Sequence, residues 1–302
     1  MNYKHVIVVG IDGAGAFIRD ASTPCFDAIF ADGAVTYSAL ASNPTISAEC
    51  WGSMLLGVGP EVHGLTNAIV SEKPYPLDSP YPSVFKRIRR AMPDAHLGSF
   101  CDWSPITRGI VETDIGVVSA SARDTELTPM IVDYIKAEKP TFLFIQMDSV
   151  DGAGHGNGYG SKAHLDRISV VDTYVQAIYN AARDIGIIDD TLFMVIADHG
   201  GTPSEGRAGH GGWTDAEKYV TFAAVGRNVN KCVIDEMNIR DLASIVLYAL
   251  GLDVPPVVPG AWTSQIPTGM FDDASIREYV DVSAETGAAP RISKTAHTSD
   301  SI

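Results

Sequence analysis

The sequence has few cysteines, few basic residues and no long apolar run, and each shortage excludes a class of protein. Its 302 residues include four scattered cysteines (Cys25, Cys50, Cys101 and Cys232) and no CxxC pair, so we expect no disulfide framework in a chain of this size. Lys and Arg number 22 against 37 Asp and Glu, a net charge of −15, which argues against a nucleic-acid-binding or membrane-binding surface. No apolar run approaches the ~18 residues that a transmembrane helix needs.

The first residues give no sign of a signal peptide. MNYKHVIVVGID enters an apolar segment by residue 5 and leaves no room for the charged and apolar regions of a signal peptide. We therefore expect a soluble cytoplasmic protein, and the hydrophobic share of 45% suffices for a sizeable core.

Short apolar runs alternate with amphipathic stretches along the chain. The runs predict buried parallel strands at His5–Ile11, Ala95–Cys101, Thr141–Met147, Thr191–Ala197 and Tyr219–Gly226, with a further strand-like run at Ala34–Leu40. The amphipathic stretches predict helices at Ser83–Met92, Asp124–Lys139, Ala163–Ile185 and Ile239–Leu250. This alternation predicts an α/β fold, a three-layer α/β/α sandwich.

Three of the predicted strands are followed by aspartates. Asp12 follows the first strand, Asp148 and Asp151 follow Thr141–Met147, and Asp198 follows Thr191–Ala197. Parallel strands bring their carboxyl ends to one edge of a sheet, where such folds bind ligands. Carboxylates that meet there repel one another, and metal ions are the simplest means of neutralising them.

Three histidines lie in glycine-rich segments after the same strands, and we expect them in loops. They are His155 in DGAGHGNG, His199 in ADHGG and His210 in GHGGW. Asp and His together suit Zn²⁺, with Mn²⁺ as an alternative. Six or seven such ligands are too many for one tetrahedral zinc but suit two metal ions ~3.5–4 Å apart. Any one of these residues alone fits a helix cap or an ordinary polar residue, so the prediction rests on their combination.

A hydroxyl nucleophile is predicted at the start of a helix. The pattern becomes helical from Ser47, and Gly57 ends it. Backbone N–H groups at a helix N-terminus favour an anion. Ser47 or Thr45 as a simple helix cap is the alternative.

Taken together, these segments resemble the alkaline phosphatase superfamily, and within it the type I phosphodiesterase/nucleotide pyrophosphatase family. The matching segments follow the family's order: Gly10–Gly13, Ser22–Gly33, the Ser47 segment through Ser53–Asn67, Asp151–His155, Ala197–Gly201 and Gly209–Gly212. The resemblance implies an alkaline-phosphatase-like, mostly parallel sheet. It also implies a single catalytic domain over 1–289 with a small cap around 68–125, followed by a tail, 290–302, that we expect to be disordered.

The resemblance also divides the metal ligands into two groups. Asp12, Asp198 and His199 hold one ion, which also binds the nucleophile Ser47, and Asp151, His155 and His210 hold the other. Ser47 lies ten residues before Gly57, as the family's nucleophile does, and Thr45 is the second choice. The family often has Thr followed by Pro-Asn, where this chain has Ser47-Ala48-Glu49-Cys50. Asn67 is a candidate phosphoryl contact, and we expect Asp148 to accept a hydrogen bond from a ligating histidine.

These features predict a metal-dependent hydrolase of phosphate esters that acts through a phosphoseryl-type intermediate on a small phosphorylated substrate such as a nucleotide. A phosphodiesterase/nucleotide pyrophosphatase fits best, and a phosphomonoesterase or a phosphonate hydrolase is the alternative. A sulfatase is disfavoured because the chain lacks a Cys- or Ser-x-Pro-x-Arg segment at the nucleophile. A dinucleotide-binding protein, from the glycines of VVGIDGAGA, and a non-catalytic protein are remote alternatives. The sequence does not predict the oligomeric state.

Overall fold

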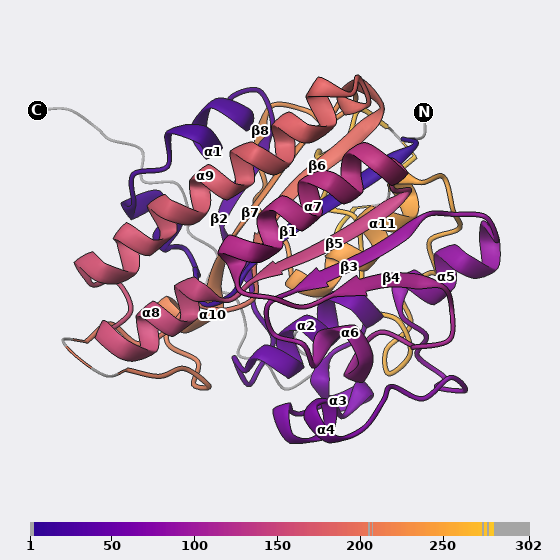
Figure 1. The fold of residues 1–302 in the computed structure, drawn as a ribbon. Helices are drawn as coiled ribbons and strands as arrows, with labels where there is room; N and C mark the ends of the chain where they lie inside the picture. The colour runs from indigo at the N-terminus through magenta and orange to yellow at the C-terminus, as the bar shows by residue number, and fades with distance from the viewer. Residues whose placement is uncertain (1–2, 205, 207, 274, 277, 281–302) are drawn as a thin grey trace, which may run out of the picture.

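The computed structural model describes residues 3–280 except 205, 207, 274 and 277, so the predicted tail lies outside the described residues. Its centre is an eight-stranded sheet in the order β4-β3-β5-β1-β6-β7-β2-β8. The strands are β1 (His5–Ile11), β2 (Ala34–Leu40), β3 (Leu97–Cys101), β4 (Val117–Ala120), β5 (Phe142–Met147), β6 (Thr191–Ala197), β7 (Tyr219–Val225) and β8 (Cys232–Val233). Helices cover both faces of this sheet (Figure 1), which confirms the predicted three-layer sandwich.

Two sets of helices form the outer layers. One set is α1 (Pro24–Ile29), α7 (Asp124–Glu138), α8 (Ser149–Asn157) and α9 (Lys162–Asp184), with α9 packed against the other three. The other set is α2 (Ser47–Leu56), α5 (Val84–Ala91) and α11 (Leu242–Ala249), which pack together. The shorter elements are α3 (Pro60–His63), α4 (Asn67–Glu72), α6 (Ile106–Gly109), α10 (Asp215–Lys218) and the 3₁₀ turns η1 (Phe17–Asp20), η2 (Ile188–Asp190) and η3 (Ile239–Asp241).

The prediction that Tyr219–Gly226 forms a parallel strand is wrong. β7 pairs antiparallel with both β6 and β2, whereas the other pairings in the sheet are parallel. A parallel neighbour requires a crossover that returns the chain to the opposite edge of the sheet. In the segment between β6 and β7, the described residues form the one-turn helix α10 and the histidine-bearing loops, and β7 starts near the edge where β6 ends.

The segment predicted as a small cap, 68–125, contributes mainly to the sandwich. It supplies β3 and β4, which extend the sheet beyond β5, and α5, which packs against α2 and α11. Only the short helices α4 and α6 remain beside the sandwich, where they contact each other. β3 is fully buried and contacts α6 and α7 besides its neighbouring strands, so burial of its apolar side chains stabilises the segment as part of the sheet.

The central strands are buried throughout, as expected when helices cover both faces of a sheet. Every residue of β5 and β6 is buried, as are Val6–Ile11 of β1. β5, β1 and β6 are neighbours, so the residues that follow them meet at one edge. Among the described residues, none of the helices is both long and apolar enough to cross a lipid bilayer.

Candidate metal centre

A first group of ligand atoms converges at the carboxyl ends of β1 and β6. Asp12 and Asp198 follow these strands and are almost fully buried. His199 Nε2 lies 3.5 Å from Asp12 Oδ1 and 3.2 Å from Asp198 Oδ2. The Ser47 hydroxyl lies 3.3 Å from the same nitrogen. The structure therefore brings together the four residues that were predicted to form one metal group.

Each of these two carboxylates has one oxygen held and one left without a partner. Asp12 Oδ2 accepts from Trp51 Nε1 at 3.0 Å and Gln146 Nε2 at 2.9 Å. Asp198 Oδ1 accepts from the backbone N–H groups of Gly13 and His199. The remaining oxygens, Asp12 Oδ1 and Asp198 Oδ2, are buried with no hydrogen-bond partner. A buried, unpaired carboxylate oxygen is costly, so this arrangement fits a bound cation.

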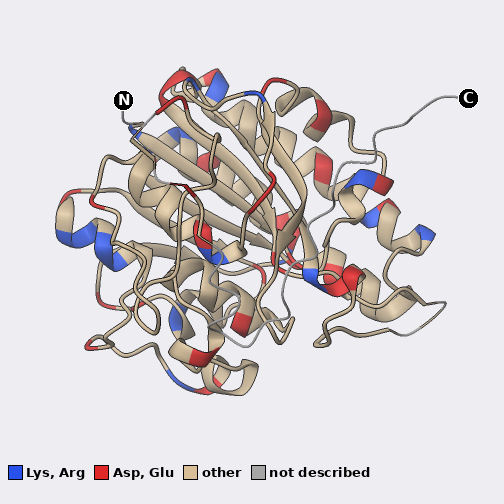
Figure 2. Ribbon diagram, turned by 180° about the vertical axis from the view of Figure 1, so that it is seen from behind, with Lys and Arg blue, Asp and Glu red and all other residues tan. Residues whose placement is uncertain are grey.

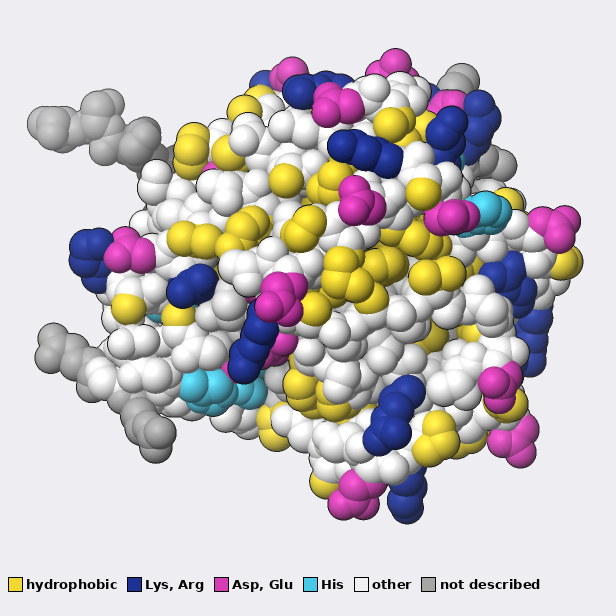
Figure 3. Space-filling model, in the orientation of Figure 1, with side chains coloured by type: hydrophobic (Ala, Val, Ile, Leu, Met, Phe, Trp, Pro, Cys, Tyr) yellow, Lys and Arg dark blue, Asp and Glu magenta, His cyan; other side chains and the backbone are white. Residues whose placement is uncertain are grey.

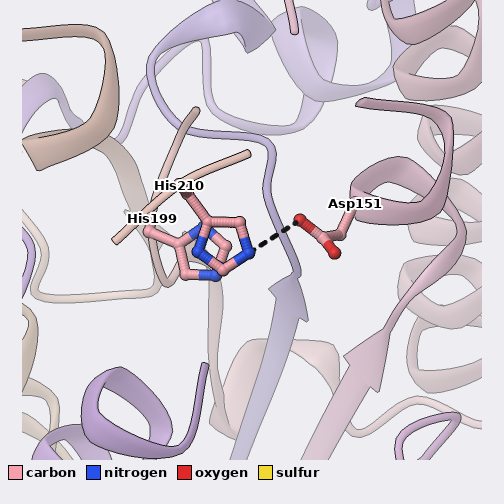
Figure 4. A group of neighbouring side chains, drawn as sticks. All are labelled: Asp151, His199 and His210. Carbon is pink, nitrogen blue, oxygen red and sulfur yellow. Dashed lines mark ion pairs between the residues drawn. The ribbon is translucent and has the colours of Figure 1, made fainter. Parts of the chain in front are cut away.

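A second group lies beside the first. Asp151 and His155 share one face of α8 at i and i+4, and His155 Nε2 lies 3.2 Å from Asp151 Oδ2. His210 Nε2 lies 3.8 Å from Asp151 Oδ1 and 3.2 Å from His155 Nε2. Figure 4 shows His210 and His199 together facing Asp151, and the two imidazoles stack with centroids 3.8 Å apart. The prediction that His155 lies in a loop is wrong, because α8 continues through the glycines of DGAGHGN.

All three histidines present Nε2 to the centre. Their Nδ1 atoms face backbone carbonyls: His155 that of Ala208, His199 that of Gly200 and His210 that of Thr45, at 2.9, 2.9 and 2.6 Å. A carbonyl only accepts hydrogen bonds, so Nδ1 carries the proton in each ring. The second nitrogen of a metal-binding histidine is commonly held in this way.

Asp148 is therefore not the histidine acceptor that the sequence predicts. Its Oδ1 accepts instead from Gln146 Nε2, the same nitrogen that bonds Asp12. Backbone carbonyls take the role predicted for Asp148, because the loops after β6 bring them within reach of the rings.

The electrostatics differ between the two groups. Burial, reinforced by neighbouring carboxylates, raises the pKa of Asp12, and burial raises the pKa of Asp198 to about 8. Burial also acts to raise the pKa of Asp151, but hydrogen bonds from His155 and Tyr159 and the charges of nearby histidines hold it below its usual value. The hydrogen bond with Asp151 raises the pKa of His155 to about 9. In the second group, a divalent cation would replace the proton shared by Asp151 and His155. In the first group, it would offset the negative charge of Asp12 and Asp198.

Among the residues that the structure describes, no lysine or arginine pairs with this centre. The hydrogen bonds and ion pairs described for the two groups include no lysine or arginine. Figure 2 shows the basic band of α5 at the far side of the molecule from α8. The centre is nevertheless reachable from solvent: the His155 side chain is 47% exposed, and histidines reach the surface near α8 and α10 (Figure 3).

The two hydroxyls proposed as nucleophile occupy different surroundings. Ser47 is the first residue of α2 and is partly exposed, with its oxygen at the first metal group. Thr45 is fully buried, donates to the Gly212 carbonyl and accepts from Gly211 N–H. Neither side chain caps α2. Thr45 therefore anchors the loop that carries His210, whereas the Ser47 hydroxyl lies at the first metal group.

Asn67 lies at the same helix end as Ser47. Its Oδ1 accepts from the backbone N–H of Ala48 at 2.9 Å. The amide is thereby oriented with Nδ2 as its remaining donor, beside the start of α2, and Asn67 is exposed to solvent. This placement is compatible with the predicted phosphoryl contact.

Sequence reasoning missed three residues that hold the ligands. Trp51 and Gln146 bond Asp12, and Tyr159 donates to Asp151 Oδ1 at 2.6 Å. The signal for Gln146 was a polar residue inside the otherwise apolar strand FLFIQM. Trp51 and Tyr159 gave no comparable signal, because an aromatic residue in a core pattern predicts packing alone.

The glycines that suggested a dinucleotide-binding loop have packing roles here. Gly13 has a φ of +68°, and a Cβ there would lie 2.5 Å from Asp151 Oδ1. A Cβ on Gly10 would lie 2.5 Å from the Trp51 ring. Gly10 lets β1 approach α2, and Gly13 lets the turn after β1 approach α8, so both help to assemble the metal centre.

His63 fixes α2, the helix that carries Ser47, and makes stability sensitive to acid. Its Nδ1 accepts from Leu65 N–H, and its Nε2 faces Ser53 Oγ and the Glu49 carbonyl, so the ring must stay neutral. Burial lowers the pKa of His63 to about 4. A depressed folded-state pKa gives stability that is present above the unfolded value of about 6.5 and lost as pH falls through about 4.

We therefore expect acidification from pH 7 to pH 4 to destabilise the wild type more than His63→Gln, by on the order of 2 kcal/mol. Urea unfolding of both proteins in EDTA across this pH range measures the difference. Parallel curves for the two proteins would contradict the assignment of a neutral, buried His63.

Comparisons with known proteins agree with this architecture. A sequence model of the family described as type I phosphodiesterase / nucleotide pyrophosphatase matches residues 111–243. A 2,3-bisphosphoglycerate-independent phosphoglycerate mutase from Natronomonas pharaonis is 30% identical over 140 residues, or 45% of this chain. The match spans only 26% of the mutase, about a quarter of that relative's length.

Solved structures share the fold. An inactive variant of murine ectonucleotide pyrophosphatase/phosphodiesterase 5, in complex with AMP, superposes with a TM-score of 0.69 at 16% identity, covering 84% of this chain and 97% of that one. A 2-O GAG sulfatase gives a TM-score of 0.73 at 13% identity over 92% of this chain and 77% of its own. The predicted resemblance to the alkaline phosphatase superfamily is confirmed.

Proposed function

We propose that this protein is a two-metal phosphodiesterase that forms a covalent phosphoseryl-type intermediate on Ser47. The observation that carries the proposal is the convergence of two buried, unpartnered carboxylate oxygens with His199 Nε2 and the Ser47 hydroxyl. Acidic oxygens and imidazole nitrogens suit Zn²⁺, with Mn²⁺ as the alternative.

The ligands divide between two ions. Asp12, Asp198, His199 and Ser47 would hold one, and Asp151, His155 and His210 the other. His199 also lies close to the second group, since its ligand atom and those of Asp151 and His210 are all within 4.8 Å of one another. When bound, such a pair of cations lowers the pKa of a coordinated hydroxyl and offsets charge on the attacking and leaving oxygens.

The protein's own residues would then carry out two displacements. Ser47 Oγ attacks phosphorus in line, the bond from phosphorus to the leaving oxygen breaks, and the departing alcohol takes up a proton. Asn67 Nδ2 and the N–H groups at the start of α2 that Asn67 Oδ1 does not occupy would orient the phosphoryl oxygens. Water then attacks the phosphoseryl group and regenerates the Ser47 hydroxyl, so the two inversions retain the configuration at phosphorus.

Two observations favour a diester over a monoester. The matching family model is that of phosphodiesterases and nucleotide pyrophosphatases. The interactions described for the centre include no lysine or arginine that would compensate the second negative charge of a monoester. AMP in the murine neighbour supports a nucleotide as substrate.

We also propose that the enzyme acts in the cytoplasm.

A paired assay tests the proposal. Zinc- or manganese-loaded protein is given bis(p-nitrophenyl) phosphate, p-nitrophenyl phosphate and a p-nitrophenyl ester of a nucleoside 5′-monophosphate. We expect a higher kcat/KM for the diesters, highest for the nucleotide ester, and no turnover in EDTA. Faster turnover of the monoester would favour a phosphomonoesterase, and no turnover with either metal would overturn the proposal.

A further inference from the structure

Gln146 is the only polar side chain in β5 and is fully buried. An unpaired amide at such a position would cost a few kcal/mol. Gln146 instead makes three hydrogen bonds: Oε1 accepts from Trp103 N–H at 2.9 Å, and Nε2 donates to Asp12 Oδ2 at 2.9 Å and Asp148 Oδ1 at 3.0 Å.

The orientation of this amide is unambiguous. The Trp103 backbone N–H can only donate, so the atom that faces it must be the carbonyl oxygen of the Gln146 amide. The NH₂ group then faces the two carboxylates, each of which takes one of its hydrogens.

The bond to Asp12 decides which oxygen remains available to a cation. Asp12 Oδ2 accepts from both Gln146 and Trp51. Oδ1, on the side of His199, is buried and unpartnered. The other hydrogen of the same NH₂ group ties Asp148 to the amide, and the Asp148 backbone N–H bonds Asp124.

We propose that Gln146 is a positioning residue for the first metal group: it turns Asp12 Oδ1 toward the cation and holds the Asp148 carboxylate on the amide. This inference rests on the proposed function in that a cation occupies the Asp12 group. The inference gives Asp12 the role of cation ligand and Asp148 that of a partner of the Gln146 amide, although both follow the ends of neighbouring strands.

The main test is Gln146→Glu, which keeps the shape of the side chain but replaces the NH₂ donor with an oxygen. We expect the zinc ion of the Asp12 group to bind about 10–100-fold more weakly, as when other partners of metal ligands are lost. The measurement is zinc affinity and stoichiometry by chelator competition, together with kcat and KM at saturating zinc.

Gln265→Glu is the matched control. Gln265 is also buried and donates from Nε2 to the Val280 carbonyl, with no described bond to the centre. It should lose stability with unchanged zinc affinity. Equal zinc affinity in Gln146→Glu and wild type would overturn the proposal.

A double variant separates positioning from a purely structural role. Adding Asp148→Asn to Gln146→Glu restores an amide–carboxylate pair with the roles exchanged. We expect the unfolding midpoint in EDTA to recover, while zinc affinity stays low because Asp12 Oδ2 still lacks the amide donor. Full recovery of zinc affinity would show that the number of charges matters rather than the bond to Asp12, which would also overturn the proposal. If the wild-type protein binds no divalent ion, the proposed function itself fails. If the wild type binds zinc and Gln146→Glu binds it equally tightly, only the role proposed for Gln146 fails.

Discussion

Ser47→Ala should reduce turnover of phosphodiesters at least ~10³-fold, because it removes the attacking oxygen. The remaining ligands of the first group, Asp12, Asp198 and His199, stay in place with their hydrogen-bond partners. We therefore expect about two divalent ions per chain in the variant, as in the wild type. Steady-state kinetics with metal analysis of the same preparations tests both parts.

Ser47→Thr is the matched comparison, because it retains a hydroxyl on the same carbon. It should keep measurable turnover and, with a slow substrate, accumulate a phosphorylated residue that mass spectrometry places at position 47. Thr45→Ser should keep both hydrogen bonds of Thr45 and near-normal activity. Full activity in Ser47→Ala would contradict the assignment of the nucleophile.

The sequence predicts the framework of this protein because apolar periodicity determines its central elements. β1, β2 and β6 begin and end where the pattern places them, α7 differs from it by one residue at its C-terminal end, and α9 differs by one residue at each end. The short edge strands β4 and β8 were missed, because edge strands are half-exposed and carry little apolar signal. The direction of β7 was wrong because a buried strand has the same pattern in either direction.

Sequence reasoning was less able to predict what surrounds each ligand. Asp12 and Asp198 were predictable because the ends of parallel strands meet, whereas their partners come from distant segments. Trp51 reaches Asp12 across 39 positions, and the Thr45 carbonyl reaches His210 across 165. Such contacts depend on the packing of whole layers, so no local pattern encodes them.

Asp198→Asn should have opposite effects on function and on the stability of the metal-free protein. Asp198 Oδ2 is buried, lacks a hydrogen-bond partner and lies 3.2 Å from His199 Nε2. That nitrogen is an acceptor, because Nδ1 of the same ring faces the Gly200 carbonyl. An asparagine Nδ2 at the position of Oδ2 would donate to it, while Oδ1 keeps its two backbone donors.

In EDTA we therefore expect Asp198→Asn to be more stable than wild type by about 1–3 kcal/mol, because the wild type must either bury a carboxylate charge or take up a proton at neutral pH, whereas the variant has a satisfied amide. With zinc the order should reverse. Ligand binding at 1,000 times Kd adds about 4 kcal/mol per site, and the variant loses most of this at the first group. Activity should fall on the order of 10³-fold or more, since a ligand of the proposed two-ion pair is lost.

Thermal or urea unfolding with and without zinc, in wild type and variant, gives the four stabilities that are needed. Asp166→Asn is the control, since Asp166 lies on the surface of α9 and pairs only with Lys162 among its described contacts. It should change stability by less than about 0.5 kcal/mol in either condition. If Asp198→Asn destabilises the metal-free protein, the carboxylate is stabilising the fold, and the case for a cation at its unpartnered oxygen is lost. If the variant is more stable than wild type in EDTA but less stable with zinc, the Asp198 carboxylate destabilises the metal-free fold and stabilises the metal-bound one. This is the behaviour expected of a metal ligand.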